Sequence, residues 1–204
     1  MPKILNEPLI LLILGTAILA LTALHPHDYA TWLMETAPIF IALPILVVTY
    51  KTYTLTPLLY RLLFLHALIL MVGGHYTYAE VPLGYWMQDW FGFARNNYDK
   101  IGHLAQGFIP ALLFRELLLR SSPLKPGKLL FTLVVASCLA VSASYELIEW
   151  AAAEMIGQGA DAFLGTQGYA WDTQSDMLMA LIGAVVAQAV LGKVQDFQLE
   201  RRVQ

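Results

Sequence analysis

Six long apolar segments are the feature that most constrains this chain. They cover residues 7–24, 30–50, 56–74, 99–119, 128–152 and 173–192. Each approaches the roughly 20 residues that an α-helix needs to cross the hydrocarbon core of a bilayer. Of the residues, 58% are hydrophobic and 13% are charged, whereas a soluble domain carries about 25% charged residues. The pattern predicts an all-α, polytopic membrane helix bundle with six transmembrane helices.

The positions of the basic residues predict the orientation of this bundle. If the N-terminus is cytoplasmic, ten of the 12 Lys and Arg residues lie at cytoplasmic ends, and only Arg95 and Lys100 lie outside. Because cytoplasmic ends retain basic residues, both termini are expected in the cytoplasm. No basic patch suggests nucleic-acid binding. We expect one integral membrane domain over residues 1–204, with an uncleaved first segment because Glu7 precedes its apolar run.

Two longer loops are predicted on the outer side, at residues 73–100 and 154–176. They are rich in Tyr and Trp, which is typical of the aromatic belt at a membrane surface. Glu35, beside the first outer loop, is expected to be solvated. Arg115 and Glu116, near the cytoplasmic end of the fourth segment, are expected to be interfacial anchors.

The last three segments each carry a pair of ionisable side chains near their outer ends. A spacing of three or four residues places both members of a pair on one helix face. Ionisable groups at membrane depth cost about 2.5–3.5 kcal/mol each and normally face a partner inside the bundle. The orientation brings the three pairs to one depth; they are Asp99 with His103, Glu146 with Glu149, and Asp172 with Asp176.

This cluster predicts a divalent metal site, because gathered carboxylates repel one another unless protons, bases or a metal compensate them. Oxygen-rich ligation with an imidazole would suit Zn²⁺, Mn²⁺ or Mg²⁺. Glu149 and Glu80 are the candidate general bases. The candidate ligands are Asp99, His103, Glu146, Asp172, Asp176 and His75. Two other interpretations stay open: helix capping by Asp99 and Asp172, and a purely structural polar network.

Four motifs resemble the YjdF-like family of bacterial inner-membrane proteins over nearly the full length. They are GGHYTYAEVPLG, NNYDKIGHLAQGFIPALLFRELLLR, SASYELIEW and GTQGYAWDTQSDM. The resemblance implies a multi-pass protein of the bacterial inner membrane and implies no activity. More loosely, the last three segments resemble the VanZ-like proteins, small membrane proteins linked to glycopeptide-antibiotic resistance. That pattern carries over to Asp99, His103, Glu146, Asp172 and Asp176.

Three functions are compatible with these features. The first is a metal-dependent membrane hydrolase or transferase at the outer leaflet, acting on a phospholipid or an undecaprenyl-type lipid-linked substrate. The second is a non-catalytic structural or binding protein, in which the acids only hold helices together. The third is a proton-coupled transporter, although the polar groups gather at one side and no inverted repeat is evident.

Overall fold

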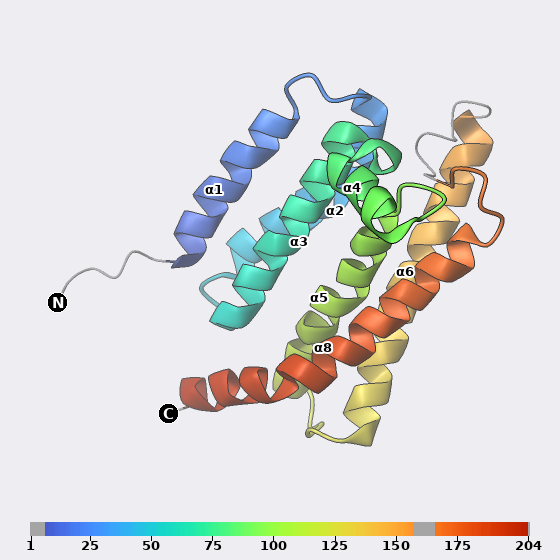
Figure 1. Cartoon of the computed structure of the whole chain (residues 1–204). Helices are drawn as coiled ribbons and strands as arrows, with labels where there is room; N and C mark the ends of the chain where they lie inside the picture. Colours follow the sequence, from blue (N-terminus) through green and yellow to red (C-terminus); the bar gives the residue numbers. More distant parts are fainter. Residues whose placement is uncertain (1–6, 157–165, 204) are drawn as a thin grey trace. The chain divides into compact units, whose positions relative to one another are not determined.

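The protein is all-helical in the part that the computed structural model describes, residues 7–156 and 166–203 (Figure 1). This confirms the predicted all-α class. The chain divides into two compact units, Met1–Thr77 and Tyr78–Gln204. The single membrane domain stays a prediction.

Apolar helices make up the described part of the N-terminal unit, where α3 packs against both of the others. They are α1 (Glu7–Thr22), α2 (Tyr29–Thr49) and α3 (Pro57–Tyr76). The side chain of Asp28 caps α2 by accepting a 2.7 Å hydrogen bond from the backbone N–H of Thr31. This bond holds the pKa of the Asp28 carboxyl below its ordinary value. Glu35 is only 5% exposed, so the expectation that it is solvated was wrong.

The C-terminal unit is built around α5, which packs against both α6 and α8 (Figure 1). Its described elements are η1 (Tyr78–Glu80), α4 (Pro82–Phe91), α5 (Tyr98–Ser121), α6 (Lys128–Ile156) and α8 (Asp172–Val203). The predicted loop 73–100 therefore contains a helix, α4, which sequence reasoning missed. The predicted loop 154–176 lies partly outside the described residues.

Four helices of the described chain are long and apolar enough to cross a membrane. They are Tyr29–Thr49, Pro57–Tyr76, Lys128–Met155 and Asp172–Arg201. The apolar helix α1 has only 16 residues. Helix α5 has 24 residues, but charged side chains at both of its ends lower its hydropathy. Six spans and cytoplasmic termini therefore stay predictions.

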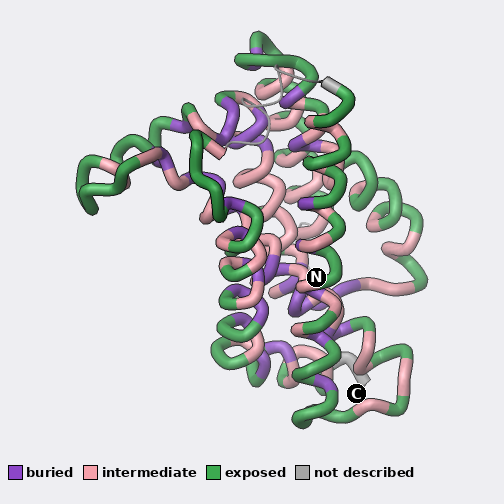
Figure 2. The backbone as a smooth tube through the Cα atoms, turned by 90° about the vertical axis from the view of Figure 1, so that its right-hand side faces the viewer, coloured by how far each residue is buried: buried purple, intermediate pink, exposed green. Residues whose placement is uncertain are grey.

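Large apolar side chains lie on the outside of the helices, as expected for helices that face lipid. The tube in Figure 2 shows exposed positions recurring along the helices. Ile41 is 66% exposed, Leu147 63% and Val190 63%, and each belongs to one of the four candidate spans. In water such a surface would aggregate, so this exposure is consistent with a bilayer around the helices.

Two glycines let α5 and α8 approach closely. A Cβ atom at Gly107 would lie 1.9 Å from the backbone oxygen of Ala180, and one at Gly183 would lie 2.2 Å from that of Leu104. Small residues at such crossings allow membrane helices to pack backbone against backbone. The close crossing places the first turns of α5 beside those of α8, where the acidic residues lie.

Candidate metal centre

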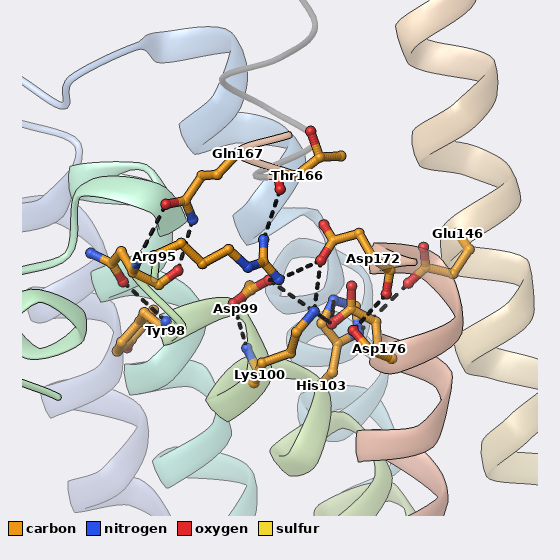
Figure 3. A network of polar contacts seen from close by, with 12 residues as sticks. Arg95, Tyr98, Asp99, Lys100, His103, Glu146, Thr166, Gln167, Asp172 and Asp176 are labelled. Atoms are coloured by element: carbon orange, nitrogen blue, oxygen red, sulfur yellow. Dashed lines mark hydrogen bonds and ion pairs between the residues drawn. The ribbon is translucent and has the colours of Figure 1, made fainter. Parts of the chain in front are cut away.

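The first turns of α5 and α8 and the C-terminal half of α6 bring ionisable side chains together (Figure 3). Asp99, Lys100 and His103 come from α5, Asp172 and Asp176 from α8, and Glu146 from α6. The four carboxylates are buried, with exposures of only 4–8%. The prediction that Asp99, His103, Glu146, Asp172 and Asp176 lie close together agrees with this arrangement.

Lys100 contacts three carboxylates in one half of this centre. Its Nζ lies 2.7 Å from Oδ1 of Asp172 and 2.6 Å from Oδ1 of Asp176. The same atom lies 3.2 Å from Oδ2 of Asp99. Three carboxylates from two helices therefore share one ammonium group. Because Asp99 and Asp172 are bound in ion pairs, capping alone does not explain them.

Arg95 joins the same half from the loop that precedes α5. Its Nη2 donates to Oδ2 of Asp99 at 3.1 Å and also to Oδ1 of Asp172. Its Nη1 donates to the backbone oxygen of Thr166 at 2.9 Å, so the arginine also ties the loop before α8 to α5. The ring of Tyr169 lies 5.1 Å from the Arg95 guanidinium carbon, within cation–π range.

A second half of the centre lies between α5, α6 and α8. His103 Nε2 is 3.7 Å from Oδ1 of Asp176, and His103 Nδ1 is 3.8 Å from Oε1 of Glu146. Gln106 Oε1 lies 3.2 Å from Nδ1 of His103. Glu146 Oε1 is buried and has no hydrogen-bond partner among the described residues. A buried carboxylate oxygen without a donor is costly, so this half lacks a partner that the first half has.

The described residues form two groups that could hold a metal ion. One is His103, Glu146 and Asp176, and the other is Asp99, Asp172 and Asp176, with ligand atoms within 4.8 Å of one another in each. The second group is already engaged by Arg95 and Lys100. The first group shares Asp176 with the second and contacts Lys100 only through this residue.

The charges of the centre do not balance. Its four buried carboxylates face two cations, Arg95 and Lys100. Two negative charges remain when all four acids are ionised and His103 is neutral. A divalent cation would cancel this surplus, whereas buried acids without compensation would have to bind protons.

Three other predicted site residues are absent from both groups of ligand atoms. His75 belongs to the N-terminal unit, where its Nδ1 lies 2.9 Å from the backbone oxygen of Thr22. Glu80 is exposed on η1, and Glu149 is half-buried one turn beyond Glu146 on α6. Their roles as ligand and general bases stay predictions.

The sequence places Arg95 and Lys100 on the outer side but does not predict their ion pairs with the cluster. The spacing of Arg95 four residues before Asp99 was the available signal. It gave little guidance because Arg95 lies before the helix, in a loop whose path the hydropathy pattern does not describe. In the described part of the chain, both cations lie within the cluster and pair with its carboxylates.

Comparison with known proteins agrees with the membrane assignment. Residues 7–197 match the family described as "Predicted membrane protein (DUF2238)". The chain belongs to this family. The DUF2238 chain is also 52% identical over 200 residues to the inner membrane protein YjdF of Escherichia coli strain K12, covering 98% of this chain and 94% of that protein. No solved structure matches. The resemblance stated from sequence motifs and the inner-membrane location are thereby confirmed.

Proposed function

We propose that His103, Glu146 and Asp176 bind a divalent metal ion, and that the protein is a metal-dependent hydrolase or transferase of the inner membrane. The observation that carries this proposal is the buried Glu146 Oε1, which has no hydrogen-bond donor among the described residues. The charge surplus of the centre supports it. Its substrate class would be a lipid or a lipid-linked envelope precursor.

The donor set fits a metal ion. Ligand atoms at about 2.0–2.2 Å from a tetrahedral Zn²⁺ lie about 3.3–3.6 Å from one another. His103 Nε2 lies 3.7 Å from Oδ1 of Asp176, and one ligand atom from each of His103, Glu146 and Asp176 lies within 4.8 Å of the others. A small inward movement of these side chains would therefore complete the site. One imidazole with two carboxylates suits Zn²⁺ or Mn²⁺ better than Mg²⁺.

The number of ligands favours catalysis over a structural role for the metal. Structural zinc sites are closed by four protein ligands, whereas catalytic sites use three and keep a position for water or substrate. A metal ion here would acidify a bound water and polarise a carbonyl or phosphoryl oxygen of the substrate. Gln106 would orient His103 by accepting a hydrogen bond from Nδ1–H, which leaves Nε2 facing Asp176.

The remaining residues would position the site or move protons. Arg95 and Lys100 form ion pairs with Asp99 and Asp172. Asp176 belongs to both halves, because it contacts Lys100 and is also a member of the group with His103 and Glu146. Glu149, one turn from Glu146, is the candidate general base, with Glu80 as the second candidate. Exposed aromatic side chains near the first turn of α8, such as Trp171 at 65% exposure, suit an amphipathic substrate.

Metal analysis tests the proposal directly. The full chain is purified without chelator, and its metal content is measured by mass spectrometry for the wild type, Glu146→Gln and Glu154→Gln. We expect one zinc or manganese per chain in the wild type and in Glu154→Gln, and none in Glu146→Gln. Mass spectrometry of lipid extracts before and after incubation with the protein then identifies any lipid that is converted only when metal is present. A wild type that never carries stoichiometric metal would overturn the proposal.

A purely structural network is the second candidate, because Arg95 and Lys100 already compensate half of the acidic charge. This alternative predicts that Asp176→Asn lowers the free energy of unfolding equally with and without added metal. The metal site predicts a larger loss in the presence of Zn²⁺, because only then does the wild type gain binding energy.

A further inference from the structure

A cavity of about 480 Å³ opens on the C-terminal unit away from the metal centre. Its lining includes Arg115 of α5, Lys128, Leu130 and Phe131 of α6, and Gln188 of α8. Arg115 follows Asp99 by 16 residues, which corresponds to about 24 Å along α5. The predicted orientation places this end of the helices at the cytoplasmic leaflet.

Arg115 is buried rather than interfacial, which corrects the expectation from sequence. It is 6% exposed, and it donates to Gln195 from Nη1 at 3.2 Å and to Asp196 from Nη2 at 3.0 Å. A guanidinium has five N–H donors, so Arg115 keeps hydrogen-bonding capacity at the wall of the cavity.

Lys128 brings a second positive charge to the same cavity. It is exposed, and it has no ion-pair partner in the described ranges. Of the acids nearby, Glu116 pairs with Arg120, and Asp196 pairs with Arg115 and balances its charge. Among the described residues that line the cavity, Lys128 therefore supplies the uncompensated positive charge.

The start of α6 adds backbone donors. Its hydrogen-bond ladder begins with Phe131 N–H to the oxygen of Gly127, at 3.0 Å. The N–H groups of residues 128–130 precede this bond, and such groups attract anions. Leu130 and Phe131 give the cavity an apolar wall beside these donors.

We propose that this cavity binds a phosphate group, supplied by the headgroup of an anionic phospholipid, with Arg115 and Lys128 on the phosphate oxygens. The apolar wall would contact the first carbons of the lipid. Basic pockets between membrane helices on the cytoplasmic side are suited to acidic headgroups. The proposal is independent of the metal centre, because it uses different residues and requires no catalysis.

Native mass spectrometry of the detergent-purified full chain tests the site, with phosphatidylglycerol as the probe. Lys128→Gln is expected to weaken phosphatidylglycerol binding about fivefold, since one charge near an anionic headgroup is lost. Lys193→Gln is the matched control, because Lys193 is also exposed but does not line the cavity. Equal affinity in the wild type and Lys128→Gln, or an equal loss in Lys193→Gln, would overturn the proposal.

A second variant and a competitor sharpen the result. Arg115→Lys keeps the charge but removes the planar set of donors, so it is expected to bind phosphatidylglycerol more weakly than the wild type. If Arg115→Lys fails to fold, Lys128→Gln decides alone. Inorganic phosphate that displaces the lipid would support a site for free phosphate groups. Failure to displace it would support a site that also requires the lipid's apolar part.

Discussion

Two buried glutamates of the C-terminal unit differ in how their oxygens are paired. Glu116 is fully buried; its Oε1 accepts from Arg120 at 2.9 Å and its Oε2 accepts from Gln195 at 3.4 Å. Glu146 is 8% exposed, and its Oε1 has no hydrogen-bond partner among the described residues. The same residue type therefore lies in a completed network in one place and in an incomplete one in the other.

The difference extends to the surrounding clusters. Around Glu116, two arginines face two acids, so the charges cancel. Around Glu146, four acids face two cations. A network that is complete within the protein needs nothing more to hold helices together, whereas an incomplete one is a place for a ligand. This contrast favours a structural role for the first cluster and supports the proposed metal binding at the second.

The largest expected effect comes from removing the ammonium group of Lys100, which three carboxylates of the candidate metal centre share. Lys100→Met leaves Asp172 and Asp176 with one cation fewer in a buried site. Loss of one partner from a buried pair costs about 3–5 kcal/mol. Denaturant unfolding of the purified protein in detergent is the measurement, performed with chelator and then with Zn²⁺. Zn²⁺ is expected to restore part of the loss, because it supplies the missing positive charge.

Arg120→Met is the control for this experiment. It removes one partner of Glu116 in the charge-balanced cluster, so it is expected to destabilise the protein without any response to Zn²⁺. An equal response of both variants to Zn²⁺ would contradict the contrast between the clusters.

The next effect concerns the helix crossing that both clusters share. Gly107→Ala places a methyl group against the backbone of Ala180, which must move for it to fit. Overpacking of this kind costs about 1–3 kcal/mol. Gly127→Ala is the control, because its Cβ would meet only the backbone oxygen of Lys125, at 3.9 Å. A Gly107 variant as stable as the wild type would show that the crossing is more adaptable than the packing indicates.

The sequence predicted the helices well because hydropathy reports lipid-facing length directly. Segment boundaries agree to within a few residues for α2 and α3. Helix α8 continues to Val203, beyond the predicted end at residue 192. The hydropathy pattern did not predict these last turns because they are polar, although they are helical. Helix α4 was missed because it is short, although Pro82 at its start and Gly92 after its end, with φ of 66°, were available signals.

The candidate site was only partly predictable. The four-residue spacings of Asp99 with His103 and of Asp172 with Asp176 gave the correct faces, and a common depth brought in Glu146. A common depth in the membrane could not show whether His75 joins the cluster. In the structure, His75 contacts Thr22 in the N-terminal unit. The ion pairs of Arg95 depend on how two loops fold, and residue spacing along a helix does not encode that.

A smaller effect, opposite in sign, is expected at Glu146 itself. Glu146→Leu replaces a carboxylate whose Oε1 lacks a donor with an apolar side chain of similar size. Without metal, we expect the free energy of unfolding to rise by about 1 kcal/mol, because an incompletely paired buried acid is removed. With Zn²⁺, the wild type should become the more stable of the two. Glu116→Leu, by contrast, should be destabilising in both conditions, since it breaks two existing hydrogen bonds.

The smallest effect is expected at Asp28, an acid that caps α2. It serves as a reference for the two buried glutamates, Glu116 and Glu146. Asp28→Ala removes the hydrogen bond to Thr31 N–H, which should cost about 0.5–1 kcal/mol near neutral pH. Because the folded pKa of Asp28 is lowered, this stability is present above the unfolded pKa of about 3.9 and is lost as the pH falls through the folded pKa. The difference between wild type and variant, followed by thermal unfolding across pH, should therefore be constant near neutrality and shrink in acid. A difference that is unaffected by acid would mean that the Asp28 carboxylate does not stabilise α2 in its charged form.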